Sequence, residues 1–344
     1  MQMNKSKYIL VTGGAGYIGS HTVVELIKNG YTPVILDDFR NAQETSINGI
    51  NAITGQDVIV RKVDVCDLLK LKAVFNEFDF EGIIHFAAYK AVGESVEKPL
   101  SYYRNNIMGL VNCLELAIEK GVENFVFSSS CTVYGEPENS KVVNENSPIQ
   151  KANSPYGNTK QVGEEIIEDV VTSGAPIRVL NLRYFNPVGA HSSALIGELP
   201  IGKPNNLLPV ITQNGVGKLN GMTVNGNDYD TVDGTCVRDY IHVSDVANAH
   251  VKGMDWLIAN DGFFAENINI GTGRGTSILE LINIFENVSE TKLNWKYAGR
   301  RSGDVVEIYA DVTKAKQILN WQSRLSVNDA VRDSWNWELK LKND

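Results

Sequence analysis

The sequence predicts an α/β fold in which a doubly wound parallel sheet is followed by a smaller α/β domain. Two observations support this prediction. Short apolar runs alternate with segments of helical periodicity through the first half of the chain, and polar or acidic side chains follow these runs where each one ends. Alternation at this spacing is typical of parallel strands joined by helices, and ligands bind beyond the carboxyl ends of such strands.

The first unit of this pattern opens the chain. Apolar runs at residues 8–11 and 32–36 predict two buried strands, and residues 20–28 between them predict a helix that ends at an Asn-Gly pair. Asp37 directly follows the second run. Strand, turn, helix, strand and acid in this order are the layout of a dinucleotide-binding unit.

Three glycines, Gly13, Gly16 and Gly19, occupy the turn between the first strand and the helix. Glycine allows the backbone to approach a pyrophosphate, which binds to the N–H groups at the helix N-terminus. A carboxylate at Asp37 accepts hydrogen bonds from an adenosine ribose and repels a 2′-phosphate, so it favours NAD over NADP. The alternative is a glycine-rich turn without a ligand, but the complete strand–helix–strand context favours a Rossmann-type NAD site.

The remaining elements follow from the same patterns. In the first half, strands are predicted at 58–63, 82–87, 124–128 and 177–182, and helices at 68–78, 100–119 and 156–171. In the second half, helices are predicted at 207–216, 244–258 and 277–288 and from 313 onward, and strands at 222–224 and 268–270. We therefore expect an NAD-binding domain at residues 1–185 and mainly a substrate-binding domain at 186–344, from which some segments return to the first sheet.

Composition excludes several classes of protein. The 344 residues are 43% hydrophobic and 21% charged, as in an ordinary globular enzyme, and the net charge of −9 argues against nucleic acid as a partner. The longest apolar runs are much shorter than a membrane span, and the first strand begins too early to leave room for a signal peptide. The four cysteines are scattered without a CxxC pair, and the five histidines lack metal-ligand spacing. We therefore expect a cytoplasmic protein with no membrane segment, disulfide or metal site.

A tyrosine and a lysine one helical turn apart predict the reaction centre. Lys160 lies four residues after Tyr156, so its ammonium can stand beside the phenol on one helix face. That charge favours the phenolate, and a hydroxyl from the run Ser128 to Ser130 can share the proton. Lowering the tyrosine pKa by about three units takes roughly 4 kcal/mol. Such a pair also occurs on solvated helix faces, so the prediction depends on the dinucleotide-binding unit that precedes it.

Longer stretches of the sequence resemble a known family. The glycine loop, the serine run and the Tyr156–Lys160 pair resemble the extended short-chain dehydrogenase/reductases, and several ordered runs resemble the UDP-glucose 4-epimerases within that group. These runs extend over nearly the whole chain and are GGAGYIGSHT (13–22), HFAAYKAVGESVEKPLSYY (85–103), FSSSCTVYG (127–135), SPYGNTK (154–160), LRYFNPVGAH (182–191), PNNLLP (204–209) and VRDYIHV (237–243).

The resemblance implies roles for residues at the matching positions. It implies an NAD site with Gly13, Gly16, Tyr17, Ile18 and Gly19 at the pyrophosphate, Asp37 and Asn41 at the adenosine ribose, Asp64 and Val65 at the adenine, and Phe86, Ala87, Lys90, Asn105, Ser128, Tyr156, Lys160 and Tyr184 around the rest of the cofactor. It implies a nucleotide-sugar site made of Ser130, Tyr156, Asn186, Asn206, Leu207, Arg238, Arg301, Asp304 and Ile308. Two arginines suit a diphosphate because their forked donors can neutralise it, and surface ion pairing is the alternative role for them.

The reaction that the resemblance implies is the interconversion of UDP-glucose and UDP-galactose at sugar C4, in galactose metabolism. Tyr156, with Ser130 and Lys160 beside it, takes the proton from the 4-hydroxyl while hydride moves to NAD. The 4-keto sugar then turns over, and hydride returns to its other face. NAD is regenerated in each turnover, so the enzyme is expected to be an isomerase that retains its cofactor. The family also implies a homodimer, paired through the helices at 100–119 and 156–171.

Three other functions share this fold. A nucleotide-sugar dehydratase needs acid–base groups just after the serine, where relatives of that type carry Asp-Glu and this chain has Cys131 and Thr132. A cofactor-sensing protein does not need an intact Ser130, Tyr156 and Lys160. A net dehydrogenase accumulates NADH in stoichiometric amounts. The fold alone does not distinguish among these functions.

Ile308 bears on the width of the sugar pocket. By resemblance, relatives confined to plain hexoses carry a tyrosine at this position, and relatives that also accept N-acetylated sugars carry a smaller residue. Isoleucine is smaller than tyrosine but branched and stiff at χ1. Two alternatives therefore stay open: the pocket also admits UDP-N-acetylglucosamine and UDP-N-acetylgalactosamine, or a neighbouring side chain such as Tyr309 fills the space.

Overall fold

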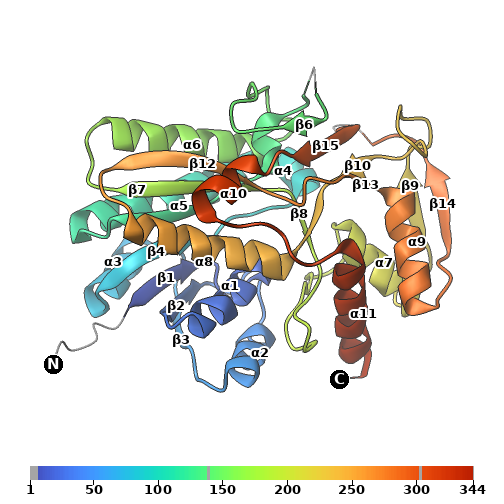
Figure 1. Ribbon diagram of the computed structural model, residues 1–344. Coiled ribbons are helices and arrows are strands. Elements are labelled where there is room, and N and C mark those ends of the chain that lie inside the picture. The colour runs from blue at the N-terminus through green and yellow to red at the C-terminus, as the bar shows by residue number, and fades with distance from the viewer. Residues whose placement is uncertain (1–6, 138–139, 302–303, 344) are drawn as a thin grey trace.

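A parallel sheet forms the centre of the molecule. The computed structural model describes residues 7–137, 140–301 and 304–343. Within them, seven strands pair in the spatial order β12-β7-β5-β4-β1-β2-β3 (Figure 1). These strands are β1 Tyr8–Thr12, β2 Thr32–Asp37, β3 Ile59–Lys62, β4 Phe80–His85, β5 Asn124–Ser128, β7 Arg178–Tyr184 and β12 Phe264–Ile270. The order reverses between β1 and β4, so the ends of these strands border the crevice in which doubly wound sheets bind ligands.

Helices cover both faces of this sheet because successive side chains of a strand point to opposite sides. Ile9 and Val11 of β1 pack with helices α1 and α8 on one face, whereas Leu10 packs with α3, α5 and α6 on the other (Figure 1). The helices of this part are α1 Tyr17–Lys28, α2 Thr45–Thr54, α3 Leu68–Glu77, α4 Val92–Glu97, α5 Pro99–Lys120, α6 Pro155–Thr172, α8 Val243–Ala259 and α10 Thr313–Leu319.

Two serine caps set the position of the predicted catalytic segment. Ser154 accepts a hydrogen bond from the backbone N–H of Gly157 at 3.1 Å, and Pro155 occupies the first position of α6. Ser130 accepts from the backbone N–H of Thr132 at 3.2 Å and caps the short 3₁₀ helix η1, Cys131–Tyr134. Tyr156 is therefore fixed in the first turn of α6.

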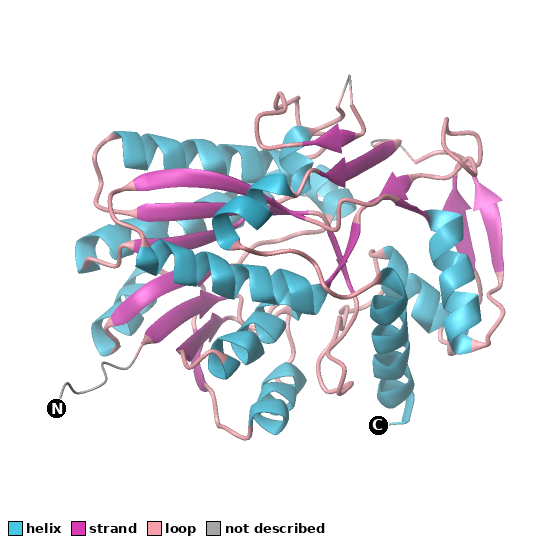
Figure 2. Cartoon of the chain, in the orientation of Figure 1, coloured by secondary structure: helices cyan, strands magenta, loops and turns pink. Residues whose placement is uncertain are grey.

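The rest of the described chain consists of short strands and helices rather than one continuous sheet (Figure 2). Its described strands form a four-stranded sheet, β13-β10-β15-β6, and two pairs, β11-β8 and β14-β9. The strands are β6 Val142–Val143, β8 Asn186–Val188, β9 Met222–Asn225, β10 Val237–Arg238, β11 Tyr240–His242, β13 Thr276–Ser277, β14 Trp295–Ala298 and β15 Glu307–Ala310. Helices α7 Leu207–Gly215, α9 Ile278–Ser289 and α11 Val327–Asn343 share an apolar core with β8, β9, β11 and β14.

The second half of the chain also contributes to the central sheet. Strand β12 pairs in parallel with β7, from Phe264 opposite Arg178 to Ile270 opposite Tyr184. Helix α8 and helix α10 pack on the same face as α1. Segments of both expected domains therefore meet in one sheet, and the boundary at residue 185 stays a prediction.

Candidate active site

A large cleft, of about 2050 Å³, opens at the carboxyl ends of β1, β2, β4, β5 and β7. Its opposite wall comes from the short sheets and includes Arg238 of β10, Trp295 of β14 and Ile308 of β15. All residues predicted for the cofactor, the nucleotide sugar and the catalysis line this cleft, with the exceptions of Asp64 and Ser130. Each of these two is the chain neighbour of a lining residue.

The glycine loop leaves no room for side chains. Gly13 has a φ of +70°, and a Cβ at this position would lie 2.8 Å from the backbone nitrogen of Ala87. A Cβ on Gly19 would lie 2.3 Å from the carbonyl oxygen of Gly13. The turn from β1 into α1 therefore requires glycine at both positions. It places the first N–H groups of α1, which have no partner within the helix, at the wall of the cleft.

Asp37 is fixed at the end of β2 by backbone donors. Its Oδ2 accepts from the N–H of Ala15 at 3.1 Å, and its Oδ1 accepts from the N–H of Phe39 at 2.9 Å. Burial raises the pKa of this carboxyl, and the two backbone donors lower it. The carboxylate and the glycine loop thus form one rigid unit on the cleft wall.

Arg40, which no motif predicts, joins the acids at this edge. Its guanidinium pairs with the carboxylates of Asp38 and Asp64 and donates to the hydroxyl of Tyr89 at 2.8 Å. Asp64 also accepts from the N–H of Cys66 at 2.8 Å. Asp64 is therefore held beside the cleft rather than in it, and its role at an adenine stays a prediction.

Glu198 connects the predicted cofactor residues with the predicted nucleotide-sugar residues. Its Oε1 accepts from Nζ of Lys90 at 2.9 Å and from Nδ2 of Asn206 at 2.6 Å. Its backbone oxygen accepts from Nε1 of Trp337 at 3.0 Å. Glu198 lies in the loop between β8 and α7, where no periodicity or motif marks it, so sequence reasoning had no signal for this contact.

The serine run and Tyr184 meet at the ends of β5 and β7. The hydroxyls of Ser128 and Tyr184 lie 2.7 Å apart in the buried interior. Ser130 is buried as well, and its hydroxyl bonds to the phenol of Tyr156, where it partly offsets the rise in pKa that burial causes. Three predicted hydroxyl groups are therefore gathered around one end of α6.

Lys160 and Tyr156 lie on the buried face of α6, but the ammonium of Lys160 bonds to a group other than the phenol of Tyr156. Nζ of Lys160 donates to the carbonyl oxygen of Ser128 at 2.6 Å and lies 4.8 Å above the ring centroid of Phe127. Burial lowers the pKa of Lys160 to about 8, and the carboxylate of Glu164 opposes this shift. Burial raises the pKa of Tyr156 well above that of a free tyrosine. The expected lowering of the phenol pKa is therefore not found in the chain itself, because burial outweighs the groups that favour the phenolate.

Two predicted arginines reach the opposite wall of the cleft. Arg301 donates to Oδ1 of Asp304 through Nη2 at 2.6 Å and through Nε at 3.0 Å, and its side chain is 66% exposed. Arg238 donates through Nη1 to the carbonyl oxygen of Val237 at 2.9 Å. A guanidinium carries five N–H donors, more than these bonds use, so both arginines retain donors for a ligand. Asn186, at the start of β8, lines the same wall.

Ile308 lines the cleft from β15 with a side chain that is only 4% exposed. It packs against Val133, Tyr134 and Phe185, which places it close to η1 and the serine run. Tyr309 points to the other side of the strand, where a Cβ on Gly275 would lie 3.2 Å from its ring. Tyr309 therefore does not fill the space beside Ile308.

Two kinds of feature are absent from the part of the chain that the structure describes. Across residues 7–137, 140–301 and 304–343, no helix is long and apolar enough to cross a membrane. In the same ranges, no group of three or more histidine, cysteine and acidic side chains could hold a metal ion.

Comparison with known proteins identifies the family. A family model described as GDP-mannose 4,6 dehydratase matches residues 10–334. UDP-glucose 4-epimerase 2 of Arabidopsis thaliana is 47% identical over 335 residues, which cover 96% of this chain and 95% of the relative. UDP-glucose 4-epimerase of Bacillus subtilis is 47% identical over 330 residues, 96% of each chain. A crystal structure of UDP-glucose 4-epimerase from Bifidobacterium longum, in complex with NAD+ and UDP, matches with a TM-score of 0.94 at 41% identity and covers 98% of this chain and 99% of that one. The chain therefore belongs to the UDP-glucose 4-epimerase family of the extended short-chain dehydrogenase/reductases.

Proposed function

We propose that this protein is an isomerase of galactose metabolism that interconverts UDP-glucose and UDP-galactose at sugar C4, with retained NAD and a transient 4-keto sugar. The observation that carries the proposal is one continuous cleft. It joins the glycine loop, the pair Tyr156 and Lys160, and the pair Arg238 and Arg301. Two nucleotide ligands can therefore approach the tyrosine from opposite ends. The relatives, which match over almost the whole chain, support the same activity.

The residues of the first sheet fit NAD. Gly13 and Gly19 form a cradle that a Cβ would fill, so a pyrophosphate can approach the backbone closely. Asp37, at the end of β2, supplies a carboxylate for a ribose diol. These residues would hold NAD, which would supply a reversible hydride acceptor for sugar C4. Lys90, Asn105 and the other predicted residues of this wall complete the proposed cofactor site.

Tyr156 is the proposed base for the 4-hydroxyl of the sugar. Burial favours the neutral phenol, and the hydroxyl of Ser130 is the neighbour that lowers the Tyr156 pKa. We propose that proton transfer depends on this hydroxyl and on the positive charge of Lys160, one helical turn away. Ser130 can share the transferred proton from its position beside the phenol. Lys160 has a second proposed role, to donate to the nicotinamide ribose from its buried position at Ser128.

The opposite wall is proposed to anchor the UDP group while the hexose turns. Arg238 and Arg301 bring two positive charges to a chain whose net charge is −9, so the attraction for a diphosphate is local. Asp304 can accept from a uridine ribose hydroxyl. Asn186, Asn206 and Leu207 contribute polar and apolar contacts along the same wall. A site that holds UDP firmly and the hexose loosely permits both faces of the 4-keto sugar to meet the cofactor.

The dehydratase alternative fails on the two residues after Ser130. Burial raises the pKa of the Cys131 thiol to about 12, so it does not ionise at neutral pH. Thr132 carries a hydroxyl, which is neither an acid nor a base at neutral pH. Neither residue can supply the acid–base pair that elimination across C5 and C6 requires, although the matching family model bears the description of a dehydratase.

We also propose that the pocket admits N-acetylated UDP-hexoses. Ile308 lines the cleft with a side chain smaller than tyrosine, and Tyr309 points to the other side of the strand.

The helices α5 and α6 are the proposed interface of a homodimer, which the exposure of Leu100 and Met108 on α5 supports. Four free cysteines support a cytoplasmic location.

Product analysis tests the proposed function. Purified protein is incubated with UDP-galactose and no added NAD, and the hexose released by mild acid is identified. The proposal expects UDP-glucose at equilibrium with UDP-galactose, and no net NADH. Accumulation of NADH indicates a dehydrogenase, a 4-keto-6-deoxy sugar indicates a dehydratase, and an unchanged substrate refutes catalysis on this nucleotide sugar.

A further inference from the structure

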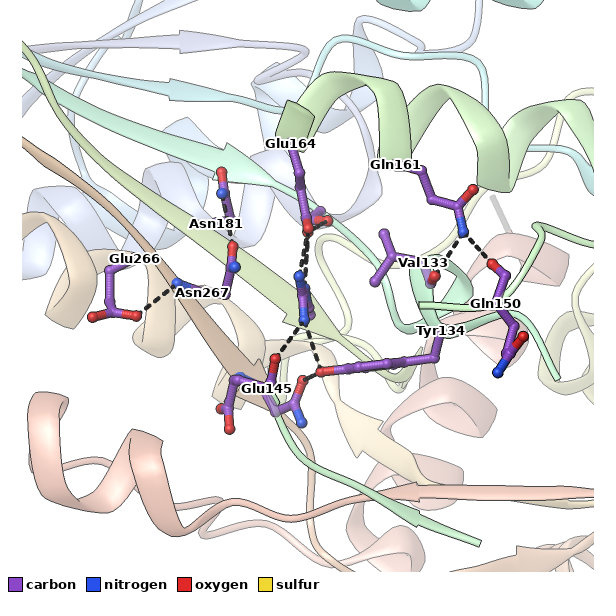
Figure 3. Close-up of polar contacts among 12 residues, drawn as sticks. Val133, Tyr134, Glu145, Gln150, Gln161, Glu164, Asn181, Glu266 and Asn267 are labelled. Carbon is purple, nitrogen blue, oxygen red and sulfur yellow. Dashed lines mark hydrogen bonds and ion pairs between the residues drawn. The ribbon is translucent and has the colours of Figure 1, made fainter. Parts of the chain in front are cut away.

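A buried ion pair lies next to the proposed catalytic residues. Arg183 of β7 donates to Glu164 of α6, from Nη2 to Oε2 at 2.6 Å and from Nε to Oε1 at 3.0 Å (Figure 3). The two side chains are 4% and 12% exposed. Arg183 also donates through Nη1 to the hydroxyl of Tyr134 at 3.1 Å. Both charges are thus buried and paired, in the bidentate geometry that gives the strongest bonds.

The carboxylate of Glu164 is connected to both elements that carry the proposed catalytic groups. On α6 it lies one helical turn after Lys160. Across the interface, its Oε1 accepts from the hydroxyl of Ser129 at 2.5 Å. Ser129 is the middle residue of the serine run: the carbonyl of Ser128 accepts from the ammonium of Lys160, and Ser130 lies beside the phenol. Glu164 therefore bonds the serine run to the helix that carries the tyrosine and the lysine.

The same network extends toward the sugar pocket. The hydroxyl of Tyr134 donates to Oδ1 of Asn269 on β12 at 2.6 Å, and the N–H of Asn269 donates to the carboxylate of Glu145 at 2.7 Å (Figure 3). The ring of Tyr134 packs in the apolar cluster that contains Ile308. Arg183 thus contacts two elements of the site, α6 and η1, from a strand of the central sheet.

Stability alone does not account for this pair. Desolvation costs several kcal/mol per buried ion, and well-packed apolar side chains of similar volume often stabilise a fold as much or more. Paired charges at this place therefore suggest a role in what they position or in the electric field that they create. Both effects act on Lys160 and on the serine run.

We propose that Glu164 and Arg183 are positioning residues for the epimerase reaction: Glu164 holds the serine run against α6 and, through its negative charge, keeps the buried Lys160 protonated. This inference rests on the proposed function, because it assigns Lys160 and Ser130 to catalysis. It makes Arg183 the residue that orients the Glu164 carboxylate. The two residues act through their neighbours and do not touch the substrate.

The charges around Lys160 determine the expected direction of the effect. The titratable and charged groups near it are Tyr156 and Glu164 on its own helix, His85 on β4, and Arg183 and Tyr184 on β7. Burial keeps His85 neutral, with a pKa of about 3. Among these groups, Glu164 is therefore the negative charge that raises the pKa of Lys160 against the effect of burial. Removing that charge leaves Arg183 uncompensated and disfavours the ammonium further.

The central test is Glu164→Gln, which keeps the shape of the side chain and removes its charge. The expected result is a fall in kcat of roughly ten- to a hundredfold at pH 6, where Lys160 is protonated in both proteins, because the serine run loses its fixed geometry. The basic limb of the pH–rate profile, where Lys160 loses its proton, is expected to move to lower pH by about one unit. Glu164→Asp, which keeps the charge, is expected to restore the position of this limb.

Glu338→Gln is the matched control. The Glu338 side chain is 4% exposed and pairs at 2.7 Å with Lys218, whose side chain is 39% exposed. This pair joins α11 to the segment that follows α7, away from the serine run. The control is expected to lose stability while its basic limb stays in place. Ser129→Ala, which removes one bond and no charge, is expected to lower kcat several-fold without moving the limb.

Two outcomes overturn the proposal. The first is a Glu164→Gln protein whose basic limb matches wild type and whose rate falls only with its folded fraction. The second applies if Glu164→Gln does not fold: Glu164→Asp and Ser129→Ala proteins with wild-type kcat then contradict the positioning role. A wild type that does not convert UDP-galactose refutes the proposed function instead. In that case, NMR titration can still measure the pKa of Lys160 in wild type, in Glu164→Asp and in Glu164→Gln. Wild type and Glu164→Asp keep the negative charge, so a lower Lys160 pKa in Glu164→Gln alone shows that Glu164 keeps Lys160 protonated.

Discussion

The two walls of the cleft are built differently. The wall on the central sheet presents backbone groups and short side chains: the glycine loop has no space for a Cβ, and Asp37 is tied to the N–H groups of Ala15 and Phe39. The opposite wall presents long charged side chains from short strands and loops. Arg301 is 66% exposed and is paired with Asp304 three residues away.

This difference matches two different tasks. A backbone cradle loses little conformational entropy on binding and suits a ligand that stays, whereas exposed arginines have to be ordered each time a ligand binds. The proposed cycle needs both, because NAD is regenerated in place while the nucleotide sugar exchanges. We therefore expect substitutions on the first wall to release the cofactor and substitutions on the second wall to raise KM.

The largest effect is expected where the two walls meet. Tyr156→Phe keeps the ring and removes the hydroxyl, so folding and NAD content should match wild type. The loss of general-base assistance should lower kcat by roughly 10²–10⁴. Steady-state rates with UDP-galactose and the absorbance of bound cofactor measure the two properties. Near-normal turnover would show that another group is the base.

The cofactor wall should not tolerate a methyl group in its loop. A Cβ on Gly19 meets the Gly13 carbonyl at 2.3 Å, so Gly19→Ala should purify without bound NAD and with a lower melting temperature. Gly55→Ala is the control: its φ is +68° but no atom lies within 4 Å of the new Cβ, so it should cost only about 1 kcal/mol and keep NAD. Equal NAD content in both variants would contradict the cradle.

Acid should destabilise the part of the fold that carries the cofactor wall. Burial lowers the pKa of His21 and His85 to about 3 and that of His250 to about 4, and all three lie in helices or strands around the central sheet. In the unfolded chain they bind protons near pH 6.5, so stability is complete above that pH and falls as the pH decreases toward 4. Three protons change the free energy of unfolding by up to roughly 4 kcal/mol per pH unit. This loss of stability is measured by urea midpoints and by NAD release between pH 8 and 4.5. Urea midpoints that do not change below pH 6.5 would contradict the assignment of neutral histidines.

The second wall should respond in binding rather than in cofactor content. Arg301→Ala should raise KM for UDP-galactose roughly 10- to 100-fold, with little change in kcat, bound NAD or melting temperature. Arg300→Ala is the neighbouring control, because Arg300 pairs with Asp228 and stacks 4.3 Å from the ring centroid of Tyr229 instead of lining the cleft. The comparison fails if both variants raise KM equally or if Arg301→Ala loses NAD.

The smallest effect concerns the choice of sugar. If Ile308 leaves space for a 2-acetamido group, Ile308→Tyr should lower kcat/KM for the N-acetylhexosamine pair about tenfold relative to the hexose pair. Rates with all four UDP-sugars measure this ratio. Ile308 does not control the pocket if wild type leaves the acetylated pair unchanged, or if the ratio is the same in both proteins.

Much of the central sheet could be predicted from local sequence. Helix α5 was expected at 100–119 and runs from Pro99 to Lys120, because its periodicity is long and its ends are marked by proline and glycine. Helix α2 was missed. It contains residues of low helix propensity and Gly49, which tertiary packing requires, since a Cβ there would lie 2.2 Å from the carbonyl oxygen of Leu195.

The second wall was predictable only in part. Strands β6, β10 and β13 have two residues each, too few for any periodicity, and they are paired across large distances in the chain, as Tyr309 is with Val142. The motifs located the glycine loop and the Tyr156–Lys160 pair. They could not show that Lys160 bonds to Ser128 or that Glu198 holds Lys90, because these contacts depend on tertiary packing.

The retention of NAD through turnover is the most direct test of the difference between the walls. Protein purified and gel-filtered without added cofactor is analysed for NAD, allowed to complete many turnovers of UDP-galactose, filtered again and analysed once more. The account predicts about one NAD or NADH per chain before and after, and full activity without added NAD. A chain that is isolated empty, or that loses its cofactor during turnover and needs NAD to restart, would contradict it.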